Sequence, residues 1–214
     1  MFIIRKYKTP ARIAKWTDED VHLVHNVSRR ISTSTLLEIK QSVIDSIGIA
    51  PKYLLDEIPS ILNVYEAVND EVSSLEERIK SIIFELDPPT LSIPGMGPIS
   101  CATILGELGD LSRFPSAEQC VAYAGVDVGI SQSGTKCHRG KMVKRGSSHL
   151  RYALMNVVRT VCIHTPTFKD YWVRKKVDGH KFLRVADSHA AKKLVRVIYH
   201  LETHCTKYDP SRCK

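Results

Sequence analysis

A long heptad repeat constrains the fold of this chain more than any other sequence feature. Apolar residues recur at alternating spacings of three and four for more than four heptads, a pattern typical of a coiled coil or a long helical hairpin. A core helix of a bundle is the alternative to a coil that pairs two chains. Pro59 indicates either the true start of the helix or a kink, and Pro88 and Pro89 end it. The repeat consists of Leu54, Ile58, Ile61, Tyr65, Val68, Val72, Leu75, Ile79, Ile82 and Leu86.

The segment before the repeat predicts two helices. Residues 1–16 are basic and look irregular, with Pro10 as a breaker. Thr17 stands before three acidic residues, which is typical of an N-cap and a first helical turn. We therefore expect one helix from Thr17 to about Ser32 and a second over residues 33–47.

The segment after Pro89 predicts short helices joined by glycine-rich turns. No convincing alternating strand is present, although residues 125–144 could hold a short hairpin. The fold is therefore predicted to be mainly α. The helices are expected at about 98–108, 116–124, 147–163, 167–176 and 186–204. The predicted organisation is linker helices at 1–50, the coiled coil at 51–87 and a compact helical domain at 88–210.

The charge of the chain is distributed unevenly. Residues 1–100 carry 11 Lys and Arg against 14 Asp and Glu, a net charge of −3. Residues 101–214 carry 20 against 9, a net charge of +11. This polarity predicts that the second half meets a polyanion, and a solvated basic surface is the alternative.

Composition argues against a membrane protein and against a zinc protein. No apolar run approaches the roughly 18 residues that span a membrane, and the first residues do not have the order of a secretory signal. We expect a cytoplasmic protein. Six cysteines occur without a C-x-x-C pair, so they are interpreted as free thiols.

A glycine turn before a small-residue helix is the first motif that could carry function. Gly95 and Gly97 lie in the run Ile93–Pro98. A glycine turn that opens a helix exposes backbone N–H groups at a positive helix end, where a phosphate oxygen can bind. The motif resembles a helix-hairpin-helix element, which grips the DNA backbone without reading sequence. Plain connectors between helices have the same pattern.

A basic segment rich in glycine and serine is the second motif. Its cations could neutralise phosphates or support a negative transition state at phosphorus. A serine in this field could attack a phosphodiester if a base or a metal ion takes its proton. The alternative is a basic DNA-binding loop whose serines only donate hydrogen bonds to phosphate. The expected nucleic-acid-binding residues here are Lys136, Arg139, Lys141, Lys144, Arg145 and Arg151.

In this order, the two motifs and their surroundings resemble the transposases of bacterial insertion sequences in the IS110 group, serine recombinases that are guided by a bridge RNA. The resemblance extends from about Arg5 onward and is strongest from Ile93 to Pro210. Each matching piece is weak alone, and their joint occurrence is specific. The pieces are Ile93–Pro98, Leu108–Phe114, Ala122–Asp127, Gln132–Gly134, Lys144–Gly146, Leu150–Arg151 and Leu194–Leu201.

The resemblance implies a division of labour within the family. A RuvC-like domain binds magnesium through four acidic residues, a coiled coil follows, and a helical transposase domain supplies a serine that links covalently to DNA. The matching serine is Ser133, with Ser131 as the reserve candidate. The resemblance also implies dimers or higher oligomers that bind DNA and a structured guide RNA.

This sequence departs from the family pattern at its amino-terminal side. No RuvC-like domain and no acidic tetrad can be assigned, so no metal site and no cofactor are predicted for this chain, and magnesium is expected in the missing domain. Residues 1–50 would then be a remnant or linker. We expect the nucleic-acid-binding carboxy-terminal part of a transposase that is inactive alone. The alternatives are a non-catalytic coiled-coil module that binds DNA or RNA, and a protein that uses only the coil.

Overall fold

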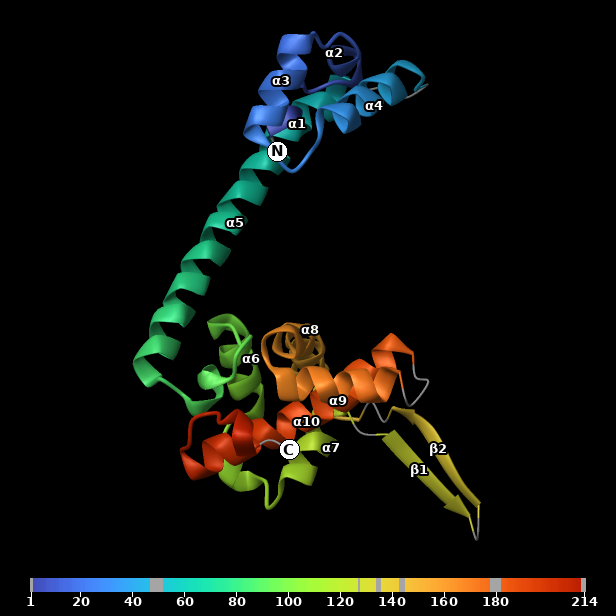
Figure 1. Cartoon of the computed structure of the whole chain (residues 1–214). Helices are drawn as coiled ribbons and strands as arrows, with labels where there is room; N and C mark the ends of the chain where they lie inside the picture. Colours follow the sequence, from blue (N-terminus) through green and yellow to red (C-terminus); the bar gives the residue numbers. More distant parts are fainter. Residues whose placement is uncertain are drawn as a thin grey trace. The chain divides into compact units, whose positions relative to one another are not determined.

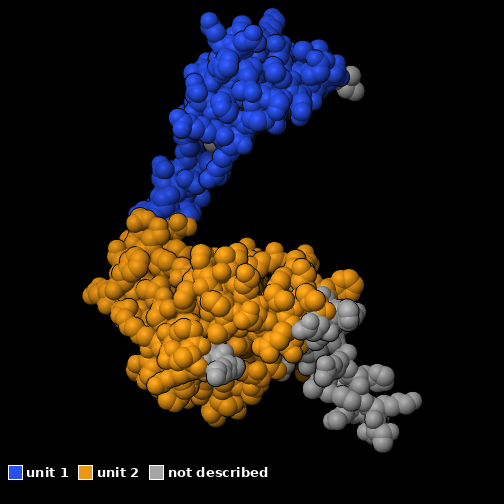
Figure 2. Space-filling view, in the orientation of Figure 1, with its two compact units in different colours: residues 1–74 blue, residues 75–214 orange. Residues whose placement is uncertain are grey.

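The fold is mainly α, as predicted, with one two-stranded hairpin (Figure 1). The computed structural model describes residues 2–46, 52–126, 128–133, 136–142, 145–177 and 182–212, and residues 52–54, 128–133 and 136–142 are described by their backbone alone. The chain divides into two compact units, Met1–Ser74 and Leu75–Lys214 (Figure 2). The division falls inside a single long helix.

Unit 1 consists of four short helices and the first part of that long helix. Its small core is built around an edge-to-face contact between Tyr7 and Trp16, whose ring centroids lie 5.1 Å apart. The helices are α1 (Phe2–Tyr7), α2 (Pro10–Ala14), α3 (Asp18–Val27), α4 (Thr33–Ile44) and α5 (Lys52–Leu86). The buried core residues are Tyr7, Trp16, Val21, Val24 and Leu36.

The prediction that residues 1–16 are irregular is wrong. Pro10 occupies the first turn of α2, where its missing N–H costs nothing because that position has no partner within the helix. The hydroxyl of Thr9 caps the helix by accepting a hydrogen bond from the Arg12 backbone N–H at 3.2 Å. The proline therefore begins a helix here instead of breaking one.

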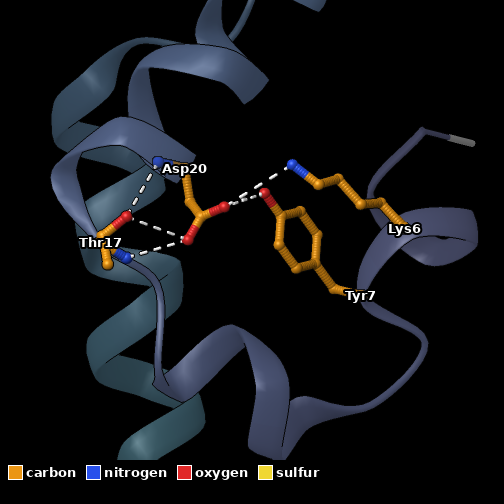
Figure 3. Close-up of polar contacts among 4 residues, drawn as sticks. All are labelled: Lys6, Tyr7, Thr17 and Asp20. Atoms are coloured by element: carbon orange, nitrogen blue, oxygen red, sulfur yellow. Dashed lines mark hydrogen bonds and ion pairs between the residues drawn. The ribbon is translucent and has the colours of Figure 1, made fainter.

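The predicted N-cap at Thr17 is confirmed (Figure 3). Its hydroxyl accepts from the Asp20 backbone N–H at 3.3 Å, and the Asp20 carboxylate accepts from the Thr17 N–H at 3.1 Å. Tyr7 donates its hydroxyl to the same carboxylate at 2.7 Å, and Lys6 lies 3.7 Å from it. The Tyr7 hydrogen bond is the largest cause that lowers the pKa of Asp20, while burial raises the pKa of Tyr7. This cluster joins α1 to α3.

Helix α5 presents two different apolar faces. It begins before Pro59, so this proline marks neither its start nor its end. Leu62 and Ile83 are buried, at only 5% and 6% exposed. The residues of the heptad seam are instead 36–68% exposed from Ile61 to Leu86. The helix therefore buries residues outside the seam, while the seam itself stays exposed.

Unit 2 contains the larger core, which gathers around α8 and α10. Helix α10 packs against α7, α8 and α9, and α6 packs against α8. The helices fall close to their predicted ranges, except that α10 begins a turn earlier. After α5, the elements of unit 2 are η1 (Pro89–Ser92), α6 (Pro98–Leu108), η2 (Leu111–Arg113), α7 (Ala117–Ala124), β1 (Val128–Ser133), β2 (Lys136–Met142), α8 (Ser148–His164), α9 (Pro166–Lys176), α10 (Leu183–His204) and η3 (Pro210–Arg212).

Polar contacts hold the beginning of unit 2 against its end. The Glu202 carboxylate accepts from the Thr90 backbone N–H at 2.8 Å. The Ser92 hydroxyl accepts from the Tyr208 backbone N–H at 2.7 Å.

None of the helices in the described part of the chain is long and apolar enough to cross a membrane.

Buried thiols line this core. Burial raises the pKa of Cys101 to about 12, and that of Cys120 and Cys162 to about 11. Burial is the larger cause, and the negative charges of Glu202 and Asp187 contribute to the raised pKa of Cys101 and of Cys162 respectively. All three are free and protonated at neutral pH, so they pack as small apolar side chains.

Candidate nucleic-acid interface

The glycine turn before α6 is shaped by packing. Gly95 has a φ of +91°, and a Cβ at this position would lie 2.6 Å from the carbonyl oxygen of Thr160 on α8. The Thr165 hydroxyl donates to the Pro94 carbonyl at 3.1 Å and holds the same turn from the end of α8. Gly95 is thus required by the close approach of two backbones.

Gly97 is in a different position. It is the N-cap of α6, with a φ of −81°, and a Cβ added there would meet no atom within 4 Å. A phosphate approaching the start of α6 would meet this open side. The element before the turn is the four-residue 3-10 helix η1, which is shorter than the full first helix of a helix-hairpin-helix element. Of the two glycines predicted to bind nucleic acid, only Gly97 has no packing role in the described part of the chain.

The basic segment forms a hairpin, the alternative that the sequence left open for residues 125–144. β1 pairs antiparallel with β2, and an irregularity in the register lies between Val128 and Ile130. The Cα of Ser133, the last residue of β1, pairs with that of Lys136, the first residue of β2, and Ser131 pairs with His138. Arg139 and Lys141 also lie on β2, while Lys144 lies outside the described residues.

The carboxy-terminal end of the hairpin is anchored where three helices meet. Gly146 has a φ of +118°, and a Cβ there would lie 2.0 Å from the Tyr123 carbonyl oxygen at the end of α7. The Ser147 backbone N–H donates to that same oxygen at 3.0 Å. The Ser147 hydroxyl donates to Glu107 of α6 at 2.6 Å and accepts from the Leu150 N–H at 3.1 Å, which caps α8.

Sequence reasoning missed the anchoring role of Gly146, Ser147 and Glu107. The signal for Ser147 was present, because a serine immediately before a helix is a common N-cap. The contact of Gly146 with Tyr123 joins residues far apart in the sequence and has no local signature. The anchor fixes where the basic segment leaves the core.

The two predicted arginines next to the anchor have different surroundings. Arg145 is exposed to solvent. Arg151, on the first turn of α8, is partly buried, and its Nη1 atom is buried without a hydrogen-bond partner among the described residues. Arg145 can therefore reach a polyanion directly, whereas the Arg151 guanidinium is held in the protein surface.

The structure places the two predicted motifs near opposite ends of α8. Gly95 lies against Thr160, and Arg151 precedes Thr160 by nine residues on the same helix. At a rise of 1.5 Å per residue, the two levels lie roughly 13 Å apart along the helix axis. The glycine turn and the basic segment are therefore separate surfaces of unit 2.

Metal ligands do not gather in the described part of the chain. No group of three or more His, Cys, Asp or Glu residues comes close enough together there to hold a metal ion.

Comparison with known proteins identifies the larger part of unit 2. Residues 90–173 match the sequence model of the transposase IS116/IS110/IS902 family. Residues 90–173 are therefore similar to the transposase domain that this family model describes. The matched segment contains the glycine turn, the hairpin and α8, and it ends within α9. The predicted resemblance to insertion-sequence transposases is confirmed at this level.

Three curated relatives extend the similarity beyond the transposase domain. An uncharacterized 43.6 kDa protein of insertion element IS110 from Streptomyces coelicolor is 26% identical over 184 residues, which are 83% of this chain and 45% of that protein. A probable family 20 transposase from Pseudomonas aeruginosa is 25% identical over 155 residues, 67% of this chain and 46% of the relative. A 44.8 kDa protein of insertion element IS116 from Streptomyces clavuligerus is 25% identical over 134 residues, 61% of this chain and 32% of the relative. The chain thus spans less than half the length of these relatives.

Proposed function

We propose that this chain is the DNA-handling part of an insertion-sequence transposase, with Ser133 as the nucleophile and the basic hairpin segment as the principal contact to the DNA backbone. The observation that carries the proposal is the anchored hairpin inside the transposase domain. Ser133 is the last residue of β1 and pairs with Lys136, and Gly146 and Ser147 fix the segment that follows β2. A bound strand would meet a basic segment held at one place on a folded core.

The family resemblance assigns magnesium chemistry to a RuvC-like domain. We therefore propose nucleic-acid binding, and not independent strand exchange, as the activity of this chain alone. The proposal also includes a structured guide RNA, on the same resemblance, and a cytoplasmic location, which the sequence analysis predicts.

Replacing Lys144 and Arg145 with alanine should weaken binding to duplex DNA and flatten its salt dependence. Each phosphate contact that is lost removes about 0.9 from the slope of log K against log salt, so the double variant should lose up to roughly 2. The measurement is fluorescence anisotropy of a labelled duplex at several salt concentrations.

Ser133→Ala is the matched control within the same hairpin. A single hydroxyl adds little to many phosphate contacts, so this variant should bind DNA within about twofold of the parent. A denaturing protein gel of the same reactions with magnesium reports any covalent adduct. An unchanged salt slope in the double variant, or a complete loss of binding in Ser133→Ala, would contradict the proposed roles.

We also propose that the exposed seam of α5 pairs with the seam of a second copy. A stripe of apolar side chains on one helix face, repeated at heptad spacing, buries itself by packing against another helix. The exposed members include Val68, Val72 and Leu75, at 58%, 47% and 42%. The heptad spacing and this exposure together favour a coil between chains over a core helix within one chain.

Changing Val72 and Leu75 to glutamate should convert the oligomer to a monomer. The two glutamates of each chain would lose their contact with water in the apolar seam. They would also repel the glutamates of the second chain. The measurement is light scattering coupled to size exclusion. A double change of Ser73 and Ser74 to glutamate adds the same charge off the seam and should leave the mass unchanged. Equal masses for all three proteins would contradict the coil.

A further inference from the structure

A buried carboxylate in unit 2 orients two side chains that both line an open cleft. Asp187 on α10 is only 1% exposed. Its Oδ2 accepts from Nε and Nη2 of Arg159 at 3.1 and 2.9 Å, and its Oδ1 accepts from the indole N–H of Trp172 at 2.8 Å. The Arg159 side chain remains 56% exposed, so the carboxylate holds a guanidinium that still faces solvent.

The cleft is apolar and is lined by residues of α8, α9 and the start of α10. Its volume of about 370 Å³ is near the lower end of the range for small-molecule sites. Burial raises the pKa of Cys162 to about 11, so this wall carries no charge at neutral pH. The cleft is lined by Arg159, Cys162, Ile163, Lys169, Trp172, Val173 and Leu183.

Cations surround this apolar floor. Lys169 is exposed at the edge, and Lys176 places its Nζ 5.0 Å from the Trp172 ring centroid. Helix α9 ends in three basic residues, Arg174 to Lys176. A ligand that fits must bring a flat apolar group to Trp172 and a negative charge to the rim. A nucleotide has both, since a base stacks on aromatic rings and its phosphate pairs with Arg and Lys.

We propose that this cleft receives one unpaired nucleotide of a bound nucleic acid, with its base against Trp172 and its phosphate beside Arg159 and Lys169. The inference rests on the proposed nucleic-acid-binding function and adds a second contact to it. Asp187 is the positioning residue, because it fixes the guanidinium and the indole before the ligand arrives. A base in a continuous duplex is paired and stacked, so only an unstacked nucleotide can enter.

Tryptophan fluorescence can test this proposal on the whole chain. The protein has two tryptophans, and Trp16 is 2% exposed in unit 1, so quenching by a bound base should come from Trp172. Short oligothymidylate and oligouridylate strands should quench the emission, and their comparison distinguishes DNA from RNA as the source. An abasic strand of equal length and charge should bind about tenfold more weakly and leave the emission unquenched. Trp172→Phe should abolish the signal.

A pair of variants separates the cleft from the rest of the surface. Ile163 and Tyr152 both lie on α8 and are both 72% exposed. Ile163→Glu should remove the quenching at saturation while anisotropy still reports bound strand, whereas Tyr152→Glu should keep the full quenching at saturation.

Each other outcome counts against the cleft. Strand binding by anisotropy without quenching, or equal quenching by the abasic strand, overturns the cleft and leaves the proposed function standing. Absence of any strand binding contradicts both. Emission that changes with protein concentration alone would mean that a second copy of the chain covers the cleft, and the proposal falls.

Discussion

Gly95→Ala should lower the free energy of unfolding of unit 2 by about 3 kcal/mol, through backbone strain at a positive φ and overpacking of a close contact. The added Cβ would lie 2.6 Å from the Thr160 carbonyl oxygen, where a backbone atom and not a flexible side chain must move. Because Thr160 belongs to the central helix α8, the core cannot relax locally. Urea denaturation followed by circular dichroism measures the change.

Gly97→Ala is the matched control two residues away. Its Cβ meets nothing within 4 Å, and its φ of −81° suits alanine, so the cost should stay below about 1 kcal/mol, the usual loss of a helix cap. DNA binding by this variant also tests whether DNA approaches the start of α6, since a methyl group there would keep a phosphate away and weaken binding. Equal destabilisation by both substitutions would contradict the packing role of Gly95.

Asp187→Ala should be the most damaging loss of a carboxylate in the described part of the chain. It removes the acceptor of the Trp172 indole N–H and the carboxylate that the Arg159 guanidinium binds. Losing the shared partner of these part-buried hydrogen bonds, two of which involve a charged group, should cost about 2 kcal/mol. Thermal or urea unfolding of the variant measures this loss.

Glu118→Ala is the control for that experiment. Glu118 also binds an arginine, Arg196, at 2.7 Å, but it is 58% exposed. Ion pairs in water contribute only about 0–1 kcal/mol, so the loss should fall in that range. If both variants lose the same free energy, burial does not distinguish the two carboxylates and the positioning role of Asp187 is wrong.

The helices could be predicted from sequence where their signals are local. Thr17 and its acidic turn marked α3, and the apolar spacing marked α5, because both depend on residues a few positions apart. The same local reasoning failed at Pro10, since a proline ends one helix as readily as it begins another and only Thr9 as the cap settles which.

The candidate site was less predictable because its geometry is non-local. Gly95 and Gly97 look equivalent in sequence, and only the approach of Thr160 separates them. Asp187 is one of two acidic residues in the basic helix α10, and nothing nearby in sequence indicates that it meets Arg159 and Trp172. The basic segment was predictable from composition, but the anchor at Gly146 requires the end of α7.

Oxidation of the buried cysteines in unit 2 depends on how often its core unfolds. Thiolate is the reactive form of cysteine, and pKa values of about 11 to 12 leave almost none of it at neutral pH at Cys101, Cys120 and Cys162. Cys101 and Cys120 are fully buried, so an oxidant reaches their sulfur atoms only in molecules whose helices have separated. Cys162 lines the open cleft, and Cys205 is exposed, so neither is shielded in this way. Oxidation of Cys101 and Cys120 would therefore report how often the domain has unfolded, and oxidation of Cys205 how oxidising its surroundings have been.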